Sequence, residues 1–98
     1  MYRGRIYARR ATVPTISEFY GIVIRMFVND HPPPHFHARY AEHSVRVSIA
    51  TGEAIDGELP RRAARLVKEW ADARRAELEA NWRRAEKMEP LRPIEPLR

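Results

Sequence analysis

Residues 35–40 and 43–50 alternate between apolar and polar side chains, and only residues 41 and 42 separate the two segments. Such alternation is typical of strands that bury one face, and the short gap indicates an antiparallel hairpin. Paired residues of an antiparallel ladder project to the same face, so the register decides which side chains gather together. Pairing Tyr40 with His43 collects the apolar residues on one face, whereas a shift by one residue would mix the sets. We therefore predict this register.

The predicted register gives the hairpin one apolar and one polar face. The apolar face holds Phe36, Ala38, Tyr40, His43, Val45, Val47 and Ile49. The polar face holds His35, His37, Arg39, Ser44, Arg46 and Ser48. The remaining chain must therefore supply a layer that covers the apolar face.

The sequence predicts a further strand before the hairpin, a short one after it, and then a helix. Residues 22–28 are rich in β-branched and aromatic types, and residues 53–56 lie between turn signals. From Pro60 to about Met88, apolar residues recur at three- and four-residue spacings. This helix would be roughly 40 Å long, more than such strands can cover. Its end, residues 81–88, is therefore expected to overhang, to bend or to pack on another chain.

Together these elements predict a two-layer α+β domain over residues 14–98, in which one long C-terminal helix packs on the apolar face of an antiparallel sheet of three or four strands. The sheet would span about 20–57 and the helix about 60–88. Residues 90–98 contain three prolines, so we expect them to be extended. This proline-rich end could fold back along the sheet or contact a partner.

Residues 1–13 form a basic tail outside this domain. Residues 1–12 contain four arginines and no acidic residue, so removing them would lower the formal net charge from +5 to +1. The body of the chain is therefore nearly balanced, which gives only a weak electrostatic case for nucleic-acid binding. We expect the natural protein to begin at Val13, with the tail upstream of the true start. The chain has no cysteine and no apolar stretch that could span a membrane, which favours a cytoplasmic protein.

The segment "DHPPPHFHARY", residues 30–40, first suggests a metal site. His35 and His37 would lie on one face of a strand, about 6.6 Å apart, a workable separation for two ligands. A third ligand is harder to find. His43 falls on the opposite face, and three prolines hold His31 roughly 12 Å from His35 unless a cis proline bends the run. We therefore predict no cofactor; zinc is possible, with His31, His35 and His37 as its ligands, but it is not favoured.

The polar face also suggests phosphate chemistry. His35 and His37 are the candidate catalytic pair, one as general base and the other as general acid. The flanking Arg25, Arg39 and Arg46 are candidates for phosphate or RNA binding. If the protein is an enzyme, this arrangement favours a metal-independent phosphodiesterase or ribonuclease.

A non-enzymatic interaction module is the simpler alternative. Histidine, arginine and serine are ordinary on a solvated sheet face, and Asp30 could simply accept backbone hydrogen bonds in a turn. A small protein partner or a second copy of the chain would then bind the overhanging helix and the proline-rich end. The residues predicted for this interface are Trp82, Met88, Leu91, Ile94 and Leu97.

Three segments carry a family resemblance: "PTISEFYGIVIRMFVNDHPPPHFHARY", "GELPRRAARLVKEWADARRAELEANW" and "PLRPIEPL". From Pro14 to about Leu97 the chain resembles the bacterial domain of unknown function 4160 family. The resemblance implies a bacterial cytoplasmic protein encoded beside another small domain, as in a toxin and antitoxin pair, with a protein partner. It also agrees with a start at Val13, but it implies no catalytic residue. The leading functional prediction is therefore a component of such a module that binds a small protein partner, with RNA or phosphate as a further ligand of the polar sheet face. The non-enzymatic interaction module is the second prediction, and a metal-dependent hydrolase is the third.

Overall fold

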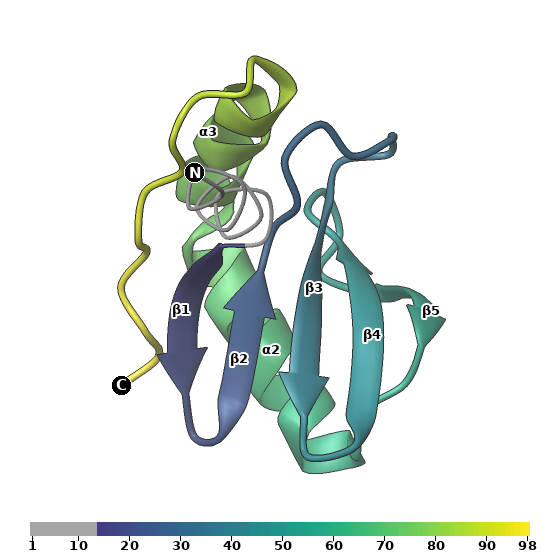
Figure 1. Cartoon of the computed structure of the whole chain (residues 1–98). Helices are drawn as coiled ribbons and strands as arrows, with labels where there is room; N and C mark the ends of the chain where they lie inside the picture. Colours follow the sequence, from purple (N-terminus) through teal and green to yellow (C-terminus); the bar gives the residue numbers. More distant parts are fainter. Residues whose placement is uncertain (1–13) are drawn as a thin grey trace, which may run out of the picture.

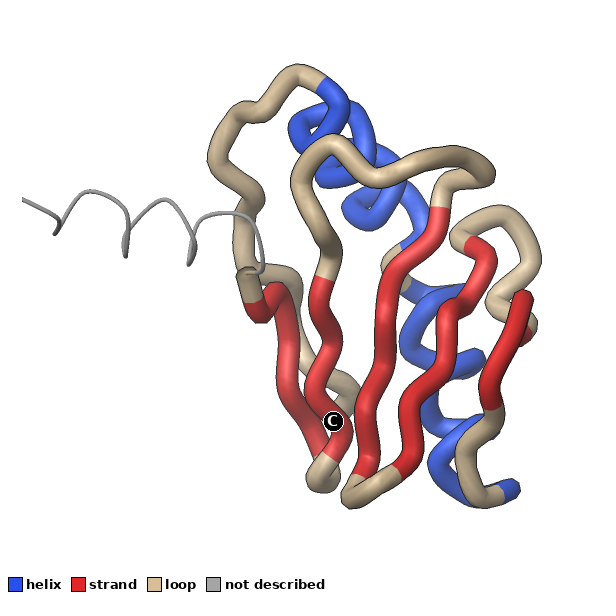
Figure 2. Tube along the Cα trace, turned by 45° about the vertical axis from the view of Figure 1, so that its right-hand side comes forward, coloured by secondary structure: helices blue, strands red, loops and turns tan. Residues whose placement is uncertain are grey.

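The computed structural model describes residues 14–98, so the predictions for the basic tail and the start site lie outside the described residues. Within residues 14–98, five strands form one antiparallel sheet in the order β1-β2-β3-β4-β5, and two helices lie on one of its faces (Figures 1 and 2). This arrangement confirms a two-layer α+β fold. The elements are β1 Thr15–Phe19, β2 Ile22–Arg25, β3 His35–Tyr40, β4 His43–Ser48, β5 Ala54–Gly57, α2 Arg61–Ala73 and α3 Arg75–Glu86.

The predicted register of the central hairpin is confirmed. Tyr40 pairs with His43, and the ladder continues without a shift to His35 and Ser48. Ala41 adopts a φ of +54° in the two-residue turn, a conformation that glycine usually supplies. The apolar face of this hairpin is buried at Phe36, Ala38, Val45, Val47 and Ile49.

The sheet has one strand more than the sequence predicted, because β1 was not foreseen. Tyr20 and Gly21 connect β1 to β2, and both have positive φ angles, 50° and 80°. Positive φ at both central residues is the pattern of a tight type I′ hairpin turn. Strand β2 ends at Arg25 rather than at Val28, and the loop that follows, residues 26–34, leads to β3.

The predicted single helix is divided into α2 and α3. Arg74, with φ −116° and ψ 22°, interrupts the helical run, and its backbone N–H donates to the carbonyls of Trp70 and Ala71. The sequence contains neither glycine nor proline at this point, so nothing in it indicated the break. Among residues 14–98, neither helix is long and apolar enough to cross a membrane.

Trp70 lies at the centre of the core. It is fully buried, and its ring packs against Phe19 at 5.3 Å and Phe36 at 5.7 Å between ring centroids. Its Nε1 donates a 2.8 Å hydrogen bond to the Glu95 carbonyl, which attaches the C-terminal segment to α2. That segment runs beside β1 (Figure 1), where the Ile94 N–H donates to the Ile16 carbonyl at 2.7 Å. The proline-rich end therefore folds back along the sheet.

This fold-back removes most of the predicted partner surface. Trp82 and Ile94 are buried, and Leu91 and Leu97 pack against the core; of the five predicted residues only Met88 is exposed. The expectation that these side chains form one free interface is therefore wrong, because the chain uses them to cover its own sheet. Partner binding elsewhere on the protein stays a prediction.

Candidate functional site

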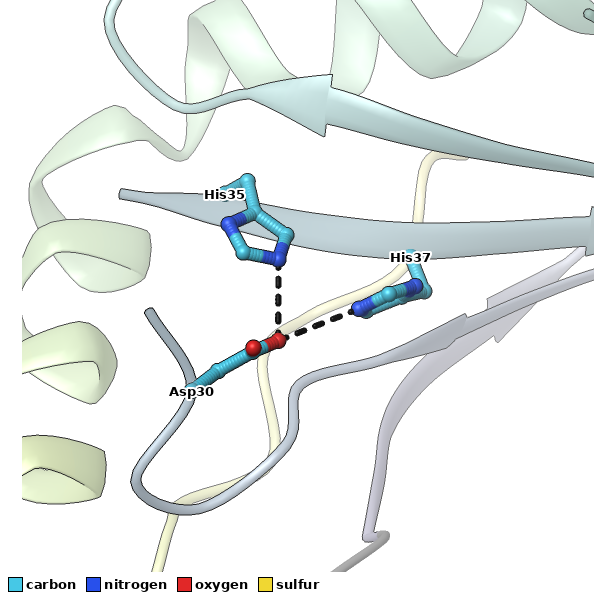
Figure 3. A group of neighbouring side chains, drawn as sticks. All are labelled: Asp30, His35 and His37. Carbon is cyan, nitrogen blue, oxygen red and sulfur yellow. Dashed lines mark hydrogen bonds and ion pairs between the residues drawn. The ribbon is translucent and has the colours of Figure 1, made fainter. Parts of the chain in front are cut away.

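Asp30 lies between two histidines of β3 (Figure 3). Its Oδ2 is 2.9 Å from Nε2 of His35 and 3.4 Å from Nε2 of His37. The two histidines are two positions apart on one strand, so they project from the same side, and the loop between β2 and β3 brings the carboxylate to them. Both imidazoles thus face one carboxylate oxygen.

The loop fixes the orientation of the carboxylate. The backbone N–H of Asn29 donates a 3.0 Å hydrogen bond to the Ala85 carbonyl, which attaches the loop to α3. The other carboxylate oxygen of Asp30, Oδ1, accepts a 2.8 Å hydrogen bond from the His31 N–H. The loop therefore engages one oxygen of Asp30 and leaves the other for the two imidazoles.

His35 is buried, whereas the sequence predicted it on a solvent-facing surface. Its side chain is 0 % exposed, because Trp82 of α3 packs 5.3 Å from its ring and the loop covers its other side. Its Nδ1 lies 2.7 Å from the carbonyl oxygen of Pro33, which can only accept, so Nδ1 carries a hydrogen. A ring so enclosed cannot contact a substrate, which argues against the proposed pair of catalytic histidines.

His37 is partly exposed and stacks on Phe27, with ring centroids 4.1 Å apart. Burial lowers the pKa of His37, and nearby positive charge acts in the same direction, against the hydrogen bond to Asp30. For Asp30, burial alone would raise the pKa, but hydrogen bonds from the His31 N–H and from His37, together with His35, bring it below its ordinary value. Near neutral pH an ionised carboxylate therefore faces a neutral His37.

His31, which the sequence offered as a third metal ligand, lies outside this cluster. Its side chain is 71 % exposed and its Nδ1 is 3.7 Å from Oδ1 of Asp30, the oxygen turned away from the other imidazoles. The Pro32–Pro33 peptide bond is cis. Asp30, which was predicted only as a turn residue, takes the place of His31 as the third candidate metal ligand. The only indication of this in the sequence was that Asp30 immediately precedes the histidine-rich segment.

The distances from Asp30 to the two histidines match the spacing of ligands around a divalent ion. Oδ2 of Asp30 and one ring nitrogen each of His35 and His37 lie within 4.8 Å of one another, the only such group among residues 14–98. Around an ion with bonds of about 2.0–2.2 Å, ligands at angles from about 90° to 109° lie roughly 2.8–3.6 Å apart. The observed separations of 2.9 and 3.4 Å fall in this range. Two imidazoles and a carboxylate suit zinc and other first-row divalent metals.

Beside this cluster, polar side chains form a row across four strands. Arg25 pairs with His37, His37 with Arg46, and Arg46 with Asp56, so all four project from the same face of the sheet. They line a groove of about 220 Å³, to which Arg39 also contributes. The structure thus brings Arg25, Arg39 and Arg46 together with His37, and it leaves His35 outside the groove.

The three arginines differ in how they are engaged. Arg46 binds Asp56 through Nε, 3.1 Å from each carboxylate oxygen, and through a second nitrogen at 2.8 Å, and this contact lowers the pKa of Asp56. Arg39 donates only a 3.3 Å hydrogen bond to the carbonyl of Ala41. Nε of Arg25 is buried and has no hydrogen-bond partner among the described residues. Arg46 is therefore already paired, whereas Arg25 and Arg39 have no acidic partner within residues 14–98.

Comparison with protein families gives a match over residues 21–83 to the model of the domain of unknown function DUF4160. The chain belongs to the DUF4160 family. No curated protein and no solved structure matches it. The DUF4160 match runs from β2 into α3 and includes every residue of the cluster and the groove, while β1 and the C-terminal segment lie beyond it. The family description states no activity, so a function for this DUF4160 protein has to be argued from the site.

Proposed function

We propose that this DUF4160 protein is a metal-dependent hydrolase whose divalent ion is bound by Asp30, His35 and His37. The observation that carries the proposal is the convergence of Oδ2 of Asp30 with Nε2 of both histidines, at 2.9 and 3.4 Å. Catalytic zinc sites commonly use three protein ligands of these types and keep a further position for water or substrate.

The hydrogen bonding of His35 supports a metal more than an ion pair. Nδ1 of His35 donates to the Pro33 carbonyl, which is the usual second contact of a metal-bound imidazole and directs the lone pair of Nε2 to the ion. A divalent ion satisfies the nitrogen and the carboxylate together.

The chemistry of such a centre follows from the ion's open position. A divalent ion held by these residues would lower the pKa of a bound water, which would make hydroxide available near neutral pH. The chain contributes two neutral donors and one negative charge, so a divalent ion keeps a net positive charge that attracts an anionic or polarised substrate. Hydrolysis is therefore the reaction class that we assign to the site.

The direct test is zinc titration by calorimetry of protein that carries no polyhistidine tag. We expect about one zinc per chain, as for other three-ligand sites. Asp30→Asn should weaken zinc binding by at least about tenfold, since even outer-shell changes cost 10- to 100-fold. His43→Gln is the matched control. His43 pairs with Tyr40, at the end of the hairpin that is farther from His35, so this variant should bind zinc as the unchanged protein does. Equal zinc binding by Asp30→Asn and the control would refute the proposal.

A toxin and antitoxin-like setting with a small protein partner rests on the family resemblance, and we keep it as a second proposal. It predicts that production of this chain slows growth of the host and that the product of the neighbouring gene reverses the effect. If the metal centre causes the effect, Asp30→Asn should remove it while His43→Gln retains it. Normal growth under production of the unchanged chain would argue against a toxin role.

A further inference from the structure

We propose that the groove beside the metal cluster binds the phosphate group of a phosphodiester, as in single-stranded RNA. This inference names the substrate class of the proposed hydrolase and rests on that function for the reaction, but not for binding. His37 connects the two sites, because its Nε2 faces Asp30 while its ring lines the groove. A phosphate in the groove would therefore lie next to the proposed ion.

Arg25 is the strongest indication of an anionic ligand. Its Nε is buried without a hydrogen-bond partner among residues 14–98, although buried polar groups are nearly always paired. A guanidinium group with a nitrogen that lacks an acceptor is costly to bury. Such a group can bind phosphate oxygens particularly well through its outer nitrogens. Arg25 lies next to His37 in the row and lines the groove, so we expect the phosphate to bind in the groove rather than on another surface.

The charge balance of the groove also fits a phosphodiester. Asp56 offsets the charge of Arg46, so the groove is left with the two arginines that have no acidic partner within the described residues, Arg25 and Arg39. A net positive charge next to a metal favours an anion, and the two guanidinium groups can each donate to phosphate oxygens.

The size of the groove limits what it can hold. Its volume of about 220 Å³ is below the range typical for sites that enclose a whole small molecule, about 300–1,000 Å³. The groove can therefore take one phosphate with part of its sugar, while the rest of the strand lies across the sheet surface. In hydrolysis, water would supply both the oxygen that bonds to phosphorus and the proton that the departing alcohol takes, so no other reactant is needed.

The test measures binding of a short single-stranded RNA to protein treated with a chelator, so that the proposed metal plays no part. We expect Arg25→Gln to weaken binding by about tenfold or more, the effect of losing one charge-assisted hydrogen bond. Arg25→Lys should recover part of the loss. Arg83→Gln removes the same charge from an exposed position of α3, and it should bind as the unchanged protein does.

Two further arms identify the ligand chemistry. An RNA analogue with a neutral methylphosphonate backbone should not bind. Inorganic phosphate should compete with RNA, because it would occupy the position of one RNA phosphate in the groove. Arg39→Gln, a change at an exposed residue, gives a second variant if Arg25→Gln does not fold. Equal RNA binding by the folded groove variants and by Arg83→Gln, or equal binding of the neutral analogue, would overturn the proposal. If the protein bound RNA but no zinc, the proposed hydrolase would be refuted, whereas the proposal that the groove binds RNA would stand.

Discussion

The two faces of the sheet are built from the same alternating strands, yet they depend on different parts of the chain. On β3, Phe36 points to the helix layer and contacts Trp70, whereas His37 points to the other face and meets Asp30 from a loop. The covered face consists of residues whose apolar character alone is enough to predict that they are buried. The polar face becomes a candidate site only through the position of one loop carboxylate. We therefore expect changes on the covered face to alter stability, and changes on the polar face to alter ligand binding.

The largest effect should follow from Trp70→Ala on the covered face. The change removes the ring that contacts Phe19 and Phe36 and the hydrogen bond to the Glu95 carbonyl. We expect the free energy of unfolding to fall by about 3–5 kcal/mol, the usual cost of such a truncation. Denaturation in urea, followed by circular dichroism, measures it. A loss below about 1 kcal/mol would contradict the role given to this core.

Zinc should stabilise the protein through the polar face. A ligand that binds only the folded state, at 100 times its dissociation constant, adds about 2.7 kcal/mol to the free energy of unfolding. We expect this gain in the unchanged protein and in His43→Gln, and its loss in Asp30→Asn. Thermal unfolding with and without zinc measures the effect. If zinc still stabilised Asp30→Asn, the ion would bind at another site, and the difference between the two faces would not hold.

Asn81→Ala tests how the helix layer holds the C-terminal segment. Asn81 is fully buried; its side chain donates to the Arg92 carbonyl at 2.9 Å and accepts from the Arg92 N–H at 3.0 Å. Its loss leaves these backbone groups unpaired, so we expect a cost of about 1–3 kcal/mol. Zinc affinity should remain unchanged, because the residue does not touch the cluster. Urea denaturation and zinc titration of one sample give both values, and a large loss of zinc affinity would count against separate roles for the two regions.

The smallest effect should come from Asp72 on the exposed side of α2. Hydrogen bonds from Arg75 and Lys68 lower the pKa of Asp72 below its ordinary value of 3.8. A carboxyl whose pKa is lowered by folding adds stability above its unfolded pKa, and this contribution disappears as the pH falls through the folded pKa. The unchanged protein should therefore lose slightly more stability than Asp72→Asn between pH 6 and pH 3. Urea denaturation at the two pH values measures this, and an identical loss in both proteins would contradict it.

The sequence predicted the parts of the fold that depend on local alternation. The hairpin register followed from the faces of Phe36 and His37, because a slip by one residue would have buried the charged set. The break at Arg74 was not predictable in this way, since no glycine or proline lies between α2 and α3. Strand β1 was overlooked because its apolar residues, Ile16 and Phe19, are three positions apart instead of two, and its ladder contains a register shift.

The candidate site was only partly predictable for a related reason. The alternation placed His37, Arg25 and Arg46 on one face, but it could not place Asp30, whose position depends on the loop backbone. The burial of His35 depends on Trp82, which is distant in sequence and reaches it only when α3 packs over the end of β3. Periodicity describes residues within an element, whereas this site is completed by contacts between elements.

The most direct test of the metal centre is the anomalous difference density of crystals grown with zinc. The account predicts one strong peak within about 2.0–2.2 Å of Oδ2 of Asp30 and of Nε2 of His35 and His37. It also predicts that the peak is absent from crystals of Asp30→Asn grown in the same way. A peak at His31 or His43 instead, or no peak at a zinc concentration that saturates other three-ligand sites, would contradict the central claim.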